Sequence, residues 1–132
     1  MSLSPAPRQS LAQIAISLLD HARLENERGF AADDRVYLMD AAEKAWNAVC
    51  HAIDHLMTVH HRTPAVGRGA HAGRAEFLEE IGRHDLALQY SYFADWLHGM
   101  IFYEGRVPKT KREMERLLDE VGQFVRAASE GE

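Results

Sequence analysis

The longest regular pattern in the chain covers residues 34–61, where apolar side chains recur every three or four positions. This spacing places them on one face of a helix, and no glycine or proline interrupts the segment. The apolar stripe consists of Leu38, Ala42, Ala45, Val49, Ile53, Leu56 and His60, widened by Trp46 and Met57. The opposite side consists of Asp40, Glu43, Lys44, Asn47, His51, Asp54 and His55. The segment therefore predicts a long amphipathic helix whose polar face is either solvated or chemically active.

Four other segments have the same helical period, and no segment shows the alternation or turn signals of β-strands. They cover residues 10–29, 72–81, 86–104 and 110–128. Short links between amphipathic helices favour antiparallel neighbours. We therefore expect an all-α, up-and-down bundle of four long helices and one short helix. Residues 10–128 form this single domain, between a disordered lead-in at residues 1–9 and a frayed end at residues 129–132.

Capping residues mark the ends of these helices. Ser10 with Gln13, and Thr110 with Glu113, have the spacing of a capping box. The other expected caps are Asp33 or Asp34 for the long helix and Asp85 for the fourth helix. The glycines expected to stop helices are Gly29, Gly82 and Gly105.

Composition and charge narrow the possible functions. A chain of 132 residues is the usual size of one domain. A formal net charge of −5 argues against a general nucleic-acid binder, although it leaves room for a local basic patch. No apolar run is long enough to span a bilayer, and the first residues lack the core of a secretory signal. We therefore expect a cytoplasmic protein that does not enter a membrane.

The single cysteine, Cys50, permits no internal disulfide and no cysteine-rich zinc cage. It lies beside the apolar stripe of the long helix, which predicts a buried and unreactive thiol. No phosphate-loop pattern and no dinucleotide glycine motif is present, so we expect no cofactor.

Histidines on two helices have the spacing of metal ligands. His51 and His55 lie one turn apart, and Asp95 and His98 form a similar pair on the fourth helix. Together the four side chains could form a metal site. Di-metal bundles, however, use two Glu-x-x-His steps and two further glutamates, so we favour separate histidines that bind no metal.

The polar face of the long helix also has two interpretations. In the first it is solvated, with Asp40 paired to Lys44 and Glu43 paired to Asn47 one turn apart. In the second it lines an acid–base cleft of an enzyme that cuts RNA or processes a nucleotide. The catalytic candidates would then be His98, His51, Glu43, Asp54 and Asp95. We favour the solvated face because charged helix faces are usually exposed.

The loop after the long helix is basic and contains several glycines, and no carboxylate side chain occurs between His55 and Arg74. Such a loop can offer both charge and backbone N–H groups to an anion. The candidate anion-binding residues are Arg62, Arg68, His71 and Arg74. A solvated loop without a ligand is the simpler alternative.

The fourth helix is apolar on two sides, which predicts that it is buried on two sides. One stripe suits the core of the bundle. The second contains Leu88 and the aromatic residues Tyr92, Trp96 and Tyr103. Aromatic residues are enriched at protein interfaces, so we expect Tyr92, Trp96 and Tyr103 to lie in a homodimer interface.

Two short motifs resemble a known family. The segment Ala-Ala-Glu-Lys-Ala-Trp-Asn-Ala at residues 41–48 resembles the EKAW-A signature of the small helical PaREP proteins of archaea. The segment at residues 97–105 resembles the LH-x-x-FYEG motif of the same family, with one extra residue before Phe102. That family is similar to the HEPN superfamily, whose members are bundles of four or five helices.

The resemblance implies a fold more strongly than an activity. Many HEPN proteins are ribonucleases with an arginine and a later histidine that are separated by four to six residues, and His98 matches that histidine. Ser91, Tyr92 and Phe93 stand where the arginine would be, so ribonuclease activity is not implied. The resemblance implies a dimer formed through the late helices and an accessory role, for example beside a nucleotidyltransferase.

The favoured hypothesis is thus a non-catalytic, cytoplasmic, HEPN-like homodimer that binds a partner protein or a nucleotide-like anion. Binding to nucleic acid is a weaker possibility. The rivals are the acid–base enzyme and, behind it, the metal-binding bundle.

Overall fold

The segment with the longest helical pattern forms α2 (Arg35–Val59), and all the other helices of the computed structural model pack against it. The structure describes residues 10–64 and 66–130, and within these ranges the chain is all-α, as predicted. The remaining helices are α1 (Leu11–Ala32), α3 (Ala70–Glu80), α4 (His84–Phe93), η1 (Ala94–Tyr103) and α5 (Lys111–Ser129). The expected lead-in at residues 1–9 lies outside the described residues.

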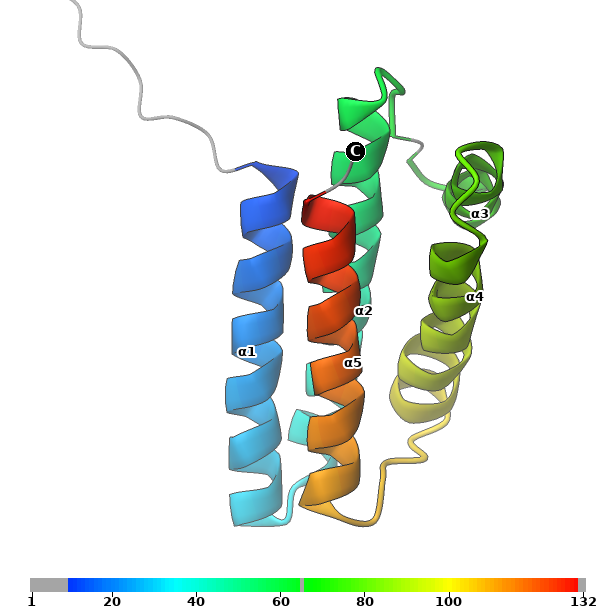
Figure 1. The fold of residues 1–132 in the computed structure, drawn as a ribbon. Coiled ribbons are helices and arrows are strands. Elements are labelled where there is room, and N and C mark those ends of the chain that lie inside the picture. The colour runs from blue at the N-terminus through cyan, green and yellow to red at the C-terminus, as the bar shows by residue number, and fades with distance from the viewer. Residues whose placement is uncertain (1–9, 65, 131–132) are drawn as a thin grey trace, which may run out of the picture.

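The helices form two groups around α2 (Figure 1). Helices α1, α2 and α5 stand side by side as long rods, while α3 and the rod made by α4 and η1 lie on the other side of α2. Buried alanines explain how α2 can pack against both groups of helices. The fully buried alanines of α2 are Ala41, Ala42, Ala45, Ala48 and Ala52. Their small side chains let neighbouring helices approach α2 closely from more than one direction.

The prediction that Gly29 stops the first helix is wrong. Helix α1 continues to Ala32, and the left-handed residue after it is Asp33, with a φ of 51°. A Cβ atom at Gly29 would lie 2.6 Å from Cδ2 of Leu38 on α2. The glycine therefore permits a close approach of α1 and α2.

Most predicted caps are confirmed. Ser10 and Gln13 form both bonds of the capping box, and Asp34 accepts a hydrogen bond from the backbone N–H of Val36 at 2.9 Å. Thr110 accepts from the backbone N–H of Glu113 at 3.1 Å. Helix α5 then extends through Ser129, one residue beyond its expected end.

The cap predicted at Asp85 is wrong. Helix α4 begins at His84, so Asp85 already lies within its first turn, and no side chain caps this helix. The Asp85 carboxylate instead accepts two hydrogen bonds from Arg83, at 3.1 and 3.2 Å. These bonds lower the pKa of Asp85.

The fourth predicted helix begins two residues earlier and ends one residue earlier than expected, and it changes its winding. From Ala94 to Tyr103 it is a π-helix, in which backbone hydrogen bonds join residues five positions apart. The wider turn brings His98 against Tyr103, with ring centroids 4.7 Å apart. The π-helix thus determines which side chains surround His98, a candidate site residue from the sequence.

None of the helices in the described part of the chain combines the length and the apolar character that crossing a membrane requires.

Candidate functional site

Polar side chains from four helices meet along one side of α2, and we call this set the polar seam. Helix α2 contributes Glu43, Trp46, Cys50 and Asp54, which are spaced three or four residues apart and so share a face. Opposite them lie His71 and Arg74 of α3, Tyr90 of α4 and His98 of η1. The seam contains three polar pairs.

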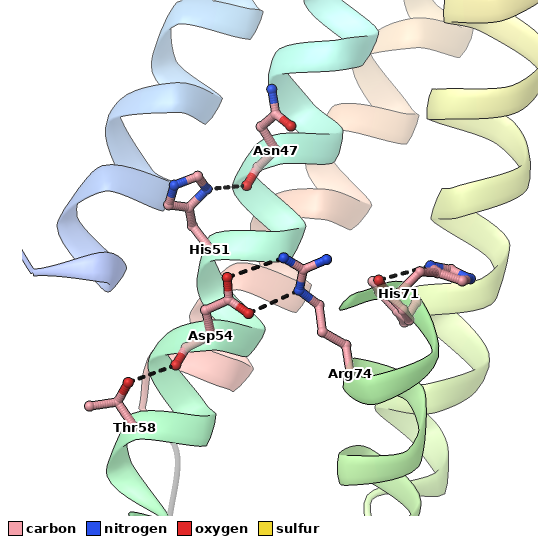
Figure 2. Close-up of polar contacts among 7 residues, drawn as sticks. Asn47, His51, Asp54, Thr58, His71 and Arg74 are labelled. Atoms are coloured by element: carbon pink, nitrogen blue, oxygen red, sulfur yellow. Dashed lines mark hydrogen bonds and ion pairs between the residues drawn. The ribbon is translucent and has the colours of Figure 1, made fainter. Parts of the chain in front are cut away.

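The first pair joins Asp54 and Arg74. Two hydrogen bonds, of 2.9 and 3.2 Å, run from the guanidinium to the two carboxylate oxygens, and each side chain is only 15% exposed. Figure 2 shows Arg74 reaching from α3 across to Asp54 on α2. Burial by itself lowers the pKa of Arg74, but the bonds to Asp54 outweigh it and raise this pKa above its usual value. A two-point ion pair of this kind fixes how α3 lies on α2.

The second pair joins Tyr90 and His71. The Tyr90 hydroxyl and Nδ1 of His71 are 2.9 Å apart, and Tyr90 is fully buried whereas His71 is exposed. The Tyr90 ring stacks on Trp46, with centroids 5.2 Å apart and ring planes 22° from parallel. Burial raises the pKa of Tyr90 to about 12.

Cys50 lies in the same part of the seam and is buried, as predicted. Burial raises the pKa of its thiol from 9.0 to about 12, against a smaller opposing effect of Arg74. The thiol is therefore protonated near neutral pH and is a poor nucleophile.

The third pair joins Glu43 and His98. Nδ1 of His98 lies 2.9 Å from a carboxylate oxygen of Glu43, so the N–H at Nδ1 donates to the carboxylate. The imidazole stacks on Trp46 at 5.8 Å and on Phe102 at 6.1 Å. Its side chain is 37% exposed, and Nε2 has no hydrogen-bond partner among the described residues. A carboxylate-oriented imidazole with an accessible nitrogen can accept or donate a proton.

His51 does not join this seam. Its Nδ1 lies 2.7 Å from the backbone carbonyl oxygen of Asn47, one turn earlier on the same helix. Figure 2 shows its ring pointing away from Arg74. Within residues 10–64 and 66–130, neither a hydrogen bond nor a ring contact joins His51 to His98. The contact on which the two-histidine cleft depends is therefore missing.

The four candidate metal ligands are not brought together. His98 is bonded to Glu43 and His51 to its own helix, while Asp95 is exposed and His55 is half-buried. In the described residues, no three His, Cys, Asp or Glu side chains are grouped closely enough to hold a metal ion. The proposed set of His51, His55, Asp95 and His98 therefore has no structural basis.

The candidate anion-binding residues are mostly engaged elsewhere. Arg62 forms a 2.5 Å ion pair with Glu80, Arg74 binds Asp54, and His71 binds Tyr90. Arg68 is exposed and takes part in none of these pairs. The carboxylates of Glu80 and Asp54 neutralise Arg62 and Arg74. Both carboxylates lie outside the loop, so the sequence of the loop alone does not reveal these pairs.

The pairs predicted within the polar face of α2 are wrong. Lys44 forms its ion pair with Glu25 of α1 instead of Asp40, and Glu43 binds His98 instead of Asn47. The polar face is thus partly covered by neighbouring helices: Glu43, Lys44 and Asp54 form contacts between helices. Asp40 is exposed.

The second apolar stripe of the fourth helix is exposed. The exposed fractions are 75% for Leu88, 43% for Tyr92, 42% for Trp96 and 71% for Tyr103. Leu88, Tyr92 and Trp96 follow one another at four-residue spacing, and we call these three side chains the aromatic face. The ring of Tyr103, at the end of the π-helix, packs on His98 instead. Tyr92 and Trp96 border a groove of about 350 Å³ against α5, whose other lining residues include Arg106, Lys109, Glu113, Arg116 and Glu120.

Comparison of the chain with protein-family models, curated proteins and solved structures finds no match.

Proposed function

We propose that this chain is a non-catalytic, HEPN-like binding module that acts in the cytoplasm as a homodimer, with the aromatic face as its interface. The dimer would present its remaining surface to a partner protein, such as a nucleotidyltransferase, or to a nucleotide-like anion. The observation that carries the proposal is the row of Leu88, Tyr92 and Trp96, which follow one another at four-residue spacing on one rod and are each at least 42% exposed. Large apolar side chains gathered in one exposed row are typical of a binding surface.

The groove beside this face favours a second copy of the chain as its occupant. Its rim carries charges of both signs, with Arg106, Lys109 and Arg116 near Glu113 and Glu120. In a two-fold interface the same patch meets itself, so a mixed rim lets each cation meet a carboxylate of the other copy. Tyr92 and Trp96 would then provide the apolar centre, where the residues that contribute most to binding usually lie.

The Asp54–Arg74 pair of the polar seam supports a function without catalysis. Both carboxylate oxygens of Asp54, a candidate base, accept hydrogen bonds from Arg74. The only arginine in the seam is therefore committed to a structural ion pair. A HEPN-type ribonuclease would need an arginine close to His98, and Ser91, Tyr92 and Phe93 occupy those positions.

Size-exclusion chromatography with light scattering tests the dimer. We expect a dimer at about 10 µM, and we expect Trp96→Ser to weaken association at least about tenfold, which corresponds to about 1.4 kcal/mol. Leu24→Ser is the matched control, because Leu24 is 56% exposed on α1, outside the aromatic face. A wild-type chain that stays monomeric at about 100 µM contradicts the proposal, as does an equal loss of dimer in both variants.

The third pair of the seam favours an enzyme as the second candidate function. His98 is oriented by Glu43 and keeps Nε2 accessible beside Trp46 and Phe102. Such an imidazole could act as acid or base on RNA or a nucleotide. Incubation of the chain with single-stranded RNA tests this: cleavage lost in His98→Ala and kept in His51→Ala supports the enzyme. Equal rates in both variants and the wild type mean that His98 does not catalyse.

A further inference from the structure

A second groove, of about 520 Å³, lies between α1 and α5 and shares no residue with the polar seam or the aromatic face. Its lining residues are Asp20, Arg23, Leu24, Asn26, Glu27, Glu115, Leu118 and Asp119. Four of the five charged side chains are carboxylates. The groove is therefore rich in hydrogen-bond acceptors, and two leucines supply its apolar surface.

Asn26 is the unusual residue of this groove. It is 1% exposed, and its Oδ1 atom has no hydrogen-bond partner among the described residues. Apart from aromatic residues and Cys50, no other polar residue of the described ranges is buried to this extent. A buried acceptor without a donor is unfavourable, because the group has lost its contact with water and gained nothing in return. A donor from outside the chain would remove this cost.

The cations already present do not reach this acceptor. Arg23 is held by Asp119 at 2.8 Å and by the Leu118 carbonyl oxygen at 3.5 Å. Lys111 lies 2.6 Å from Glu27 and 3.8 Å from Glu115. Arg23 and Lys111 therefore offset only part of the negative charge, and Asp20 is left without an ion-pair partner in the described part of the chain.

We propose that the α1–α5 groove binds a linear alkylammonium ligand, with one ammonium group donating to Oδ1 of Asn26. An ammonium has three donors and no acceptor, so it matches a groove lined by acceptors. Its methylene chain would lie on Leu24 and Leu118, as the stems of charged side chains do on apolar surfaces. Asn26 lines the groove, so its amide group borders the space that the ligand would fill.

The spread of the carboxylates favours a ligand with more than one ammonium group. Asp20 and Glu27 are seven residues apart on α1, which is about 10 Å along the helix axis. A linear polyamine has ammonium groups separated by comparable distances. An organic cation also fits better than a metal ion, because the described residues contain no group of three metal-ligating side chains.

Isothermal titration of the intact chain with spermidine, a linear triamine, tests the proposal. We expect saturable binding by the wild type and at least tenfold weaker binding by Asn26→Leu. Asp20→Asn provides a second variant at an exposed position, so a failure of Asn26→Leu to fold does not stop the test. Asp95→Asn is the matched control, because it removes an exposed carboxylate on η1 and should leave the affinity unchanged.

A capped lysine peptide forms the second arm and distinguishes the source of the ammonium group. Peptide binding that is tighter than spermidine binding and lost in Asn26→Leu supports the site and assigns it to a lysine side chain. Weaker peptide binding supports the site and assigns it to a free polyamine. Binding of either probe that is equal in Asn26→Leu, Asp20→Asn and Asp95→Asn overturns the proposal, because it then reflects the net negative charge alone. An absence of binding by both probes overturns it as well.

Discussion

Polar side chains lie between helices in both the polar seam and the α1–α5 groove. In the seam they bond to one another, whereas in the groove one buried acceptor has no donor in the described part of the chain. In the seam, Arg74 meets both carboxylate oxygens of Asp54, and Tyr90 meets His71. In the groove, Oδ1 of Asn26 meets no donor in the described part of the chain. Polar groups that satisfy one another hold the helices of the seam together, whereas the unsatisfied acceptor of the groove is the basis of the ligand proposed there. The following predictions test this contrast, beginning with the largest expected effect.

Breaking the ion pair of the seam should cost the most stability. Arg74→Met leaves the carboxylate of Asp54 partly buried and without its partner. Removal of one member of a buried pair costs about 3–5 kcal/mol, and since both side chains are 15% exposed we expect about 2–3 kcal/mol. Urea unfolding followed by circular dichroism measures this loss.

The double variant Asp54→Leu with Arg74→Met is the control for that experiment. It removes both charges and leaves apolar side chains of similar size, so it should be more stable than Arg74→Met alone. A double variant that is less stable than either single variant would show that the Asp54–Arg74 ion pair adds more to the free energy of unfolding than the neutralisation of two buried charges.

A smaller loss is expected at the tyrosine. Tyr90→Phe keeps the stacking on Trp46 but removes the hydrogen bond to His71. Because His71 is exposed and can bond to water instead, the loss in the free energy of unfolding should be about 1 kcal/mol. Tyr103→Phe is the matched control: Tyr103 is 71% exposed, so its hydroxyl should contribute almost nothing. Equal losses in the two variants would mean that the buried hydroxyl has no structural role.

The sequence predicted the features of this molecule that depend on neighbouring residues. The all-α fold, the caps at Ser10 and Asp34 and the burial of Cys50 follow from local patterns, and each is confirmed. The pairs of the seam could not be predicted in this way. Glu43 and His98 were both candidates, but they are 55 residues apart, and their contact depends on how η1 lies on α2.

Two contacts that the sequence suggested are absent from the structure. The acid–base cleft would have required His51 to face His98, but Nδ1 of His51 contacts the carbonyl oxygen of Asn47 on its own helix. Lys44 was expected to pair with Asp40, but Glu25 of α1 lies within reach. Sequence spacing reveals only partners on the same helix, so it could not show Glu25 for Lys44, and it could not decide whether His51 bonds within its own helix or to another helix. Asn26 was missed because nothing in the pattern around it distinguishes a buried asparagine from an exposed one.

The buried thiol of the seam predicts a dependence on alkaline pH. Folding raises the pKa of Cys50 from 9.0 to about 12, so the folded chain holds this proton more tightly than the unfolded chain. Stability from this group is fully present below about pH 9 and is lost as the pH rises toward about 12. The decline is at most about 1.4 kcal/mol per pH unit for each such group.

Urea unfolding of Cys50→Ala at several pH values between 8 and 11 isolates the contribution of the thiol. We expect a shallower decline than in the wild type, with a remainder from Tyr90, whose pKa is also raised to about 12. An unchanged decline in Cys50→Ala would show that folding does not raise the pKa of this thiol.

The smallest expected change in stability is at Asn26, and its sign separates the groove from the seam. Asn26→Leu replaces the buried amide with an apolar side chain of similar size, beside Leu118 and Leu24. Since no described residue donates to Oδ1, the variant loses no hydrogen bond there and is relieved of a desolvated acceptor. The free energy of unfolding should therefore stay the same or rise by up to about 1 kcal/mol in the absence of ligand. A loss of more than about 1 kcal/mol in the same urea titration would mean that Asn26 is already satisfied in the free chain. The groove would then resemble the seam, and its asparagine would be part of the fold.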